Sequence, residues 1–154
     1  NFMNAYVKTI QATLVLAFTL IVSIQTKAAD PINTSFWGNK VIDGYDPVVY
    51  HLQKKATLGS KKYTFEWKGA QWLFSSAKNR ALFQKEPLKY APQYGGYCAW
   101  AAAQGKLADT DPKLFDFYEG KLYLNYNHKT RLDWRLDKKN MVEKGNKLFP
   151  SLIK

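Results

Sequence analysis

The sequence predicts a small α+β protein that forms a single domain. Two stretches alternate aromatic and polar residues around a glycine-containing turn, which is the pattern of a β-hairpin. Other segments carry capping residues and apolar residues at helical spacing, enough for three to four helices. The 154 residues are 46% hydrophobic and 16% aromatic, which excludes a disordered chain and allows one sizeable core. We therefore expect two hairpins packed against three to four helices.

The first helix and the first hairpin are predicted from local signals. Asp46 is followed by Pro47, and proline favours the first position of a helix. An aspartate just before that position is a good cap, so we expect a short helix over residues 47–52. Alternation over residues 61–74 then predicts a hairpin that turns at Lys68-Gly69.

Two further helices are predicted in the middle of the chain. Ser75 or Ser76 is placed to cap a helix that runs to Glu86. Residues 97–104 are small and apolar enough for a buried helix, which Gly105 would end.

The C-terminal third predicts a second hairpin and a helical segment. Residues 115–126 alternate around Glu119-Gly120, as a hairpin requires. Leu132 and Leu136 are then four residues apart, which is helical spacing. Asp137 is a candidate cap for a second piece, so one kinked helix and two short helices both remain open.

Residues 1–28 have the pattern of a secretory signal peptide. Lys8 precedes an apolar run from Leu14 to Ile24, and the small residues Thr26 and Ala28 follow it. This combination predicts cleavage after Ala28 and export to the periplasm or the cell exterior. The run is too short for a membrane span of about 20 residues, so no transmembrane segment is expected in the mature chain. A retained N-terminal anchor is the alternative.

The mature chain is expected to be strongly basic. The net charge of the sequence is +11, from 23 Lys+Arg against 12 Asp+Glu. We divide the remaining chain into an extended lead-in, residues 29–40, and a domain, residues 41–150, with basic C-terminal helices. Such a surface attracts anionic lipid headgroups, polysaccharide or an acidic protein; a solvated face without a partner is the alternative. Export makes nucleic acid an unexpected partner.

Several blocks of the sequence resemble the exported branch of the YHS-domain family. These are residues 41–50 (VIDGYDPVVY), 72–90, 90–100 (YAPQYGGYCAW) and 120–126, with the region around Trp134. The resemblance implies a family whose pump-associated members are taken to bind metal through cysteines. At the matching positions this chain has Val49, Ser75 and Asn79, and none of these supplies a thiolate.

Cys98, the single cysteine of the chain, is the centre of the remaining site hypotheses. Alone, it excludes an internal disulfide and a Cys-only zinc site. If a helix starts near Tyr94, Cys98 shares its face. A buried thiol among alanines is the first interpretation; a metal ligand or a redox thiol is the alternative. A transition-metal site would have to combine Cys98 with His51 and His128.

The sequence therefore predicts a binding protein rather than an enzyme. It contains no phosphate-binding loop, nucleophile elbow or paired-carboxylate signature. One hypothesis places a metal or a small ligand near Tyr94, Tyr97, Cys98 and Trp100. The alternative is an interaction module of the cell envelope that uses its basic C-terminal helices, with Cys98 merely buried.

Overall fold

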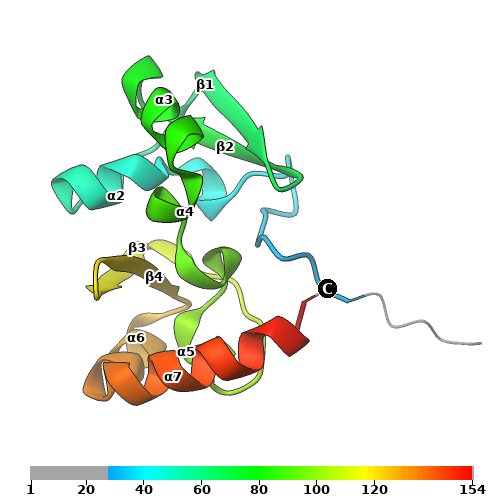
Figure 1. Cartoon of the computed structure of the whole chain (residues 1–154), viewed down its shortest axis with the longest axis vertical. Coiled ribbons are helices and arrows are strands. Elements are labelled where there is room, and N and C mark those ends of the chain that lie inside the picture. The colour runs from blue at the N-terminus through cyan, green and yellow to red at the C-terminus, as the bar shows by residue number, and fades with distance from the viewer. Residues whose placement is uncertain (1–27, 154) are drawn as a thin grey trace, which may run out of the picture.

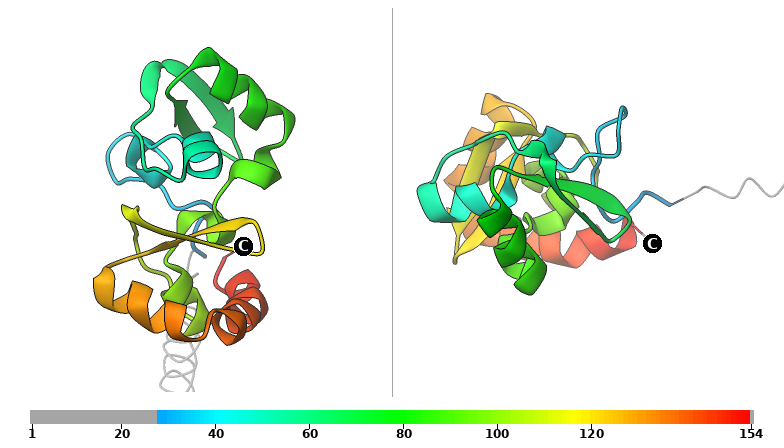
Figure 2. Two further views of the ribbon diagram at one scale, coloured as in Figure 1. Left: turned by 90° about the vertical axis from the view of Figure 1, so that its left-hand side faces the viewer. Right: turned by 90° about the horizontal axis from the view of Figure 1, so that it is seen from above.

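The computed structural model describes residues 28–153. In this range two antiparallel hairpins and six α-helices form two stacked lobes (Figure 1). The first lobe contains β1, β2 and α2 to α4, and the second contains β3, β4 and α5 to α7, as the side view in Figure 2 shows. This confirms the predicted α+β class. The elements are α2 (Pro47–Gln53), β1 (Ser60–Trp67), β2 (Ala70–Phe74), α3 (Ala77–Lys85), α4 (Pro87–Tyr90), α5 (Ala99–Ala103), β3 (Asp111–Tyr118), β4 (Lys121–Asn125), α6 (His128–Leu136) and α7 (Lys138–Leu148).

Both hairpins form where the alternation predicts them. In the first, Phe65 lies opposite Trp72, and the turn residues Lys68 and Gly69 have φ of 51° and 72°. Two successive left-handed residues match the twist of the strands they join. The second hairpin turns at Glu119-Gly120 in the same way, with φ of 49° and 74°. The two hairpins are separate two-stranded sheets.

Polar side chains cap the helices at the predicted boundaries. Asp46 Oδ1 accepts the Val48 N–H of α2 at 2.8 Å. Ser76 rather than Ser75 caps α3. At the C-terminal end the Asp137 carboxylate accepts the Asn140 N–H, so the helical segment is two helices, α6 and α7, rather than one.

The second hairpin separates two hydrophobic cores. One face of it packs against the first core, through Phe115, Phe117, Leu122 and Leu124. On the other face, Tyr123 packs against the second core with Trp134. Figure 1 shows the hairpin between the helices of the two lobes. Because both faces are covered, the hairpin joins the two lobes.

The lead-in, residues 29–40, is bound to the domain. Ile32 is buried in the first core, and the Asn33 N–H donates to the Gly95 carbonyl at 2.9 Å. Ala29 pairs in parallel with Ile153 near the C-terminal end. Gly95 has φ of 60°, and a Cβ there would overlap the carbonyl oxygen of Pro31. The lead-in can approach this closely only because residue 95 is a glycine.

The helix expected over residues 97–104 is shorter, and it does not extend back to Tyr94. Residues Gln93–Gly96 form a 3₁₀ turn in which Tyr94 and Gly95 have φ of 56° and 60°. These left-handed residues break the helical path, and α5 begins only after Cys98. The condition for a shared helical face, a helix that starts near Tyr94, is therefore not met, and Tyr94 and Cys98 do not lie on one helix.

The predicted signal peptide lies outside the described residues except for Ala28. Within residues 28–153, no helix combines the length and the apolar character needed to cross a bilayer.

Candidate functional site

Cys98 is completely buried at the start of α5. Its backbone N–H donates to the Ala108 carbonyl at 2.9 Å. Its thiol donates to Asn125 Oδ1 at 3.5 Å, and the same oxygen accepts the Trp100 N–H at 3.1 Å. The thiol thus has a polar partner and no exposed surface, which is the environment of a structural cysteine.

The aromatic residues around Cys98 are parts of the second core. Tyr94 Oη lies 3.1 Å from Asn146 Oδ1 and 3.3 Å from the Val142 carbonyl of α7. Burial raises the pKa of the Tyr94 phenol, which keeps it a neutral donor. Tyr97 Oη donates to the Asp30 carbonyl at 3.0 Å.

A ligand site at Tyr94, Tyr97, Cys98 and Trp100 would need a cavity lined by these residues, and we compared three cavities of the described residues with this expectation. One of these cavities, of about 200 Å³, touches Tyr94. None of the three is lined by Cys98, Tyr97 or Trp100. Tyr94, Tyr97 and Trp100 all pack in or against the second core, and of the three only Tyr94 also borders one of these cavities.

The two histidines differ in their exposure to solvent. His128 is the exposed first residue of α6. His51 is half-buried in the last turn of α2, where its ring contacts Tyr90 and Phe117 edge-on, with centroids 5.4 and 5.0 Å away. Its Nε2 is buried without a hydrogen-bond partner.

The described residues do not form a metal centre from Cys98, His51 and His128. Among residues 28–153 no three His, Cys, Asp or Glu side chains come together as a metal-binding group. Metal ligation would need these side chains within about 2.0–2.3 Å of one ion. The described contacts therefore give no support to a metal site built from these three residues.

Ser75 and Asn79, two of the positions at which the resemblance would place cysteines, instead donate hydrogen bonds to the buried carboxylate of Asp46. Asp46 Oδ2 accepts from the Ser75 N–H at 2.8 Å, from Ser75 Oγ at 2.7 Å and from Asn79 Nδ2 at 2.8 Å. With the Val48 N–H on Oδ1, the fully buried Asp46 side chain has four donors around it. Val49, at the third position, is buried in α2. A carboxylate so fully engaged is a structural centre that joins α2 to α3, and it does not suit a soft metal.

His51 makes the stability of the domain depend on pH. Burial, helped by the charge of Lys54, lowers the pKa of His51 to about 4 from 6.5. The unfolded chain therefore binds the proton first as the pH falls, which favours unfolding. We expect the contribution of His51 to be complete above about pH 6.5 and to be lost progressively toward about pH 4.

Chemical denaturation at a series of pH values tests this dependence. Subtracting the curve of His51→Leu from that of the native chain isolates the histidine, because the carboxylates titrate in both proteins. The difference should have a slope of up to about 1.4 kcal/mol per pH unit in this window. Parallel curves would show that His51 does not titrate differently on unfolding.

The C-terminal helices carry an apolar patch that the sequence did not predict. Leu132 and Leu136 of α6 are 59% and 85% exposed. Their spacing was correctly taken as helical, but the buried side of the segment consists of Trp134 and Val142. The spacing of apolar residues identifies a helix, but it does not show which of two apolar faces is buried in the core.

Basic residues of α6 and α7 differ in whether they have an acidic partner. Arg131 and Arg135 both bind the buried Asp116 of β3, at 2.9 and 2.6 Å, and so hold α6 on the hairpin. Lys139, Lys144 and Lys147 of α7 are exposed, and none takes part in the ion pairs of the described residues. These three lysines have no carboxylate partner in the described residues and are available to an external anion.

Comparison with known proteins gives no match: no family model, no curated protein and no solved structure is similar to this chain at a significant level.

Proposed function

We propose that this chain is a non-enzymatic interaction module of the cell envelope that docks on anionic lipid headgroups through α6 and α7. The observation that carries the proposal is the pair of exposed leucines on α6, next to a helix with three free lysines. Export, which the N-terminal sequence predicts, would bring the module to such a surface.

The apolar and basic parts of this surface complement each other at a membrane. Leu136, 85% exposed, is three residues before Lys139, so an apolar side chain and a cation lie at the junction of the two helices. Leucine inserts at the acyl boundary while lysine contacts the headgroups. Each lysine near an anionic leaflet contributes about 1 kcal/mol, and Lys139, Lys144 and Lys147 give a reversible attachment.

The competing functions find less support in the contacts. Cys98 lies buried against Asn125, whereas a nucleophilic cysteine needs an exposed, electropositive setting. A metal-holding role lacks a ligand group in residues 28–153. Both features favour the interaction module over a Cys98-centred site.

Vesicle co-sedimentation tests the proposal. The protein should pellet with phosphatidylcholine vesicles that contain phosphatidylglycerol and stay in solution with pure phosphatidylcholine. Raising the salt from about 0.1 M to 1 M shortens the Debye length from about 10 to 3 Å, and most of the binding should be lost. Absence of binding to anionic vesicles at low salt, or capture by an acidic protein alone, would overturn the proposal.

Matched variants distinguish binding through α6 and α7 from binding that depends only on the net charge of the protein. Changing Lys139, Lys144 and Lys147 to Gln should abolish most vesicle binding, and Leu136→Gln should weaken it. The control changes Lys61, Lys78 and Lys85 to Gln, three exposed lysines of the first lobe, and removes the same charge. Equal losses in the two triple variants would mean that only net charge matters.

Thiol labelling distinguishes the module from a Cys98-based enzyme. Because Cys98 is completely buried, a thiol reagent should react with the native protein only as fast as the domain opens, and rapidly in denaturant. Rapid stoichiometric labelling of the native protein would favour an active-site thiol.

A further inference from the structure

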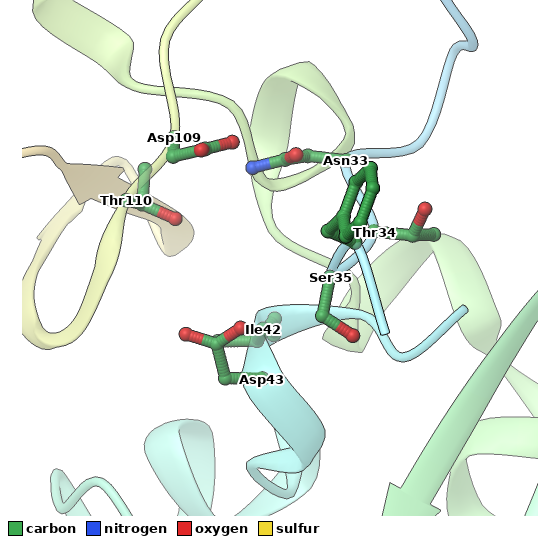
Figure 3. Close-up of a pocket in the computed structure, with 8 residues that line it drawn as sticks. Asn33, Thr34, Ser35, Ile42, Asp43, Asp109 and Thr110 are labelled. Carbon is green, nitrogen blue, oxygen red and sulfur yellow. The ribbon is translucent and has the colours of Figure 1, made fainter. Parts of the chain in front are cut away.

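A polar cavity lies where the lead-in meets the second lobe, far along the chain from the C-terminal helices. Its volume is about 170 Å³. Figure 3 shows side chains from three separate segments around it. They come from residues 33–36 of the lead-in, residues 42–43 at the start of the domain, and residues 109–110 before β3.

The cavity lining combines donors and acceptors that have fixed positions. Thr110 Oγ1 donates to the Gly96 carbonyl at 2.9 Å, and Asn33 Nδ2 makes a longer contact of 3.4 Å with the same oxygen. These bonds fix the positions of both side chains. The Asn33 amide oxygen and the second Nδ2 hydrogen remain available to bind a ligand. Ser35 Oγ donates to the Trp37 carbonyl at 3.0 Å.

Two carboxylates face this opening without a counterion. Figure 3 shows Asp109 and Asn33 pointing toward each other, with Asp43 on the other side of the opening. Neither Asp43 nor Asp109 takes part in the ion pairs of the described residues. In a chain of net charge +11, two acceptors left free of lysine are available to hydroxyl donors.

An aromatic platform borders the cavity. Phe36, which lines it, is 89% exposed, and Trp37 is 83% exposed. Their rings are in edge contact, with centroids 4.9 Å apart. Two large aromatic side chains held in water on one loop are unusual, and each offers an apolar face beside the polar groups.

From this combination we infer that the cavity binds a sugar ring of a glycan. The ring hydroxyls donate to Asp43 and Asp109 and accept from the Asn33 amide, while the C–H face of the sugar packs on Phe36. Drug-sized ligands need roughly 300–1,000 Å³, so a cavity of about 170 Å³ suits one ring of a longer chain. Trp37 is placed to contact the next sugar.

Neutral hydroxyls suit this lining better than a metal ion does. Residues 28–153 contain no group of three or more His, Cys, Asp or Glu side chains that would hold an ion. Hard cations such as calcium take six to eight oxygen ligands and usually several carboxylates. An aromatic face also supplies no oxygen, nitrogen or sulfur ligand to a metal ion.

Titration of the ¹⁵N-labelled protein with maltotriose, cellotriose and triacetylchitotriose tests the inference. At least one trisaccharide should shift the amide resonances of residues 33–37, 42–43 and 109–110 saturably, with a Kd of about 0.1–10 mM. Trp37 fluorescence should change in parallel. The inference is overturned if no trisaccharide gives a saturable shift, if the shifts map elsewhere, or if calcium chloride alone reproduces them.

Variants assign the binding to the cavity. Asp109→Asn and Phe36→Ala should each raise the Kd about tenfold, which corresponds to about 1.4 kcal/mol, without changing the melting temperature, because both side chains are exposed. The controls are Glu143→Gln and Tyr126→Ala, which remove an exposed carboxylate and an exposed aromatic ring in the second lobe. Equal effects of the cavity variants and the controls would refute the assignment.

Discussion

Asp46→Ala is expected to lower the free energy of unfolding by about 3–5 kcal/mol, a large fraction of the roughly 5–15 kcal/mol that is usual for a domain. The Asp46 carboxylate is fully buried and accepts hydrogen bonds from Val48, Ser75 and Asn79. Without it, the donors of the buried residues Val48 and Asn79 lose their acceptor and carry a desolvation cost, whereas those of the exposed Ser75 can turn to water. Guanidinium denaturation followed by circular dichroism measures the loss.

The isosteric change Asp46→Asn tests the hydrogen bonds without making a cavity. Each oxygen of Asp46 faces an N–H donor, so either orientation of the amide places its NH₂ against another donor. We expect a loss of about 2–4 kcal/mol. Asp137→Asn is the control, because Asp137 caps α7 through one oxygen only and asparagine caps equally well. Similar small losses in both variants would contradict the structural role of Asp46.

Trp134→Ala is the second large effect, with an expected loss of about 3–5 kcal/mol. Trp134 is completely buried in the second core, and its ring lies 5.0 Å from that of Tyr123. Truncation leaves a cavity between α6 and the hairpin and removes these contacts. The same denaturation assay measures the loss.

Two variants define the source of the Trp134 effect. The indole Nε1 is buried without a hydrogen-bond partner, so Trp134→Phe removes an unpaired polar group and keeps an aromatic ring. Its cost should be at most about half that of alanine. Trp37→Ala removes an exposed indole and should cost less than about 0.5 kcal/mol. Equal losses at residues 134 and 37 would show that the second core is not formed as described.

Local signals in the sequence were sufficient to predict most of the secondary structure. The caps Asp46 and Asp137 and the turns Lys68-Gly69 and Glu119-Gly120 act within a few residues of themselves. Their effect is therefore readable without knowledge of the rest of the chain. The α+β class follows from these elements.

The failures concern contacts between distant segments. The helix expected over residues 97–104 does not extend back to Tyr94, because Tyr94 and Gly95 adopt left-handed conformations; Gly95 does so where Pro31 of the distant lead-in lies against it. The sequence supplied Cys98, His51 and His128 as candidate ligands, but packing decides whether such residues meet. The cavity beside Phe36 was missed for the same reason, since its three segments come together only in the fold.

The bridge between Ala29 and Ile153 places the two ends of the described chain side by side. Such proximity suits circular permutation: a short linker joins the two ends, and new ends open at Gly120, where an added Cβ meets no atom within 4 Å. The strands of the second hairpin would then lack their covalent turn and would be held together by pairing and packing. A tag inserted next to Ala29 or Ile153 would crowd the other of these two residues, so the turn at Gly120 offers a more distant site for a label.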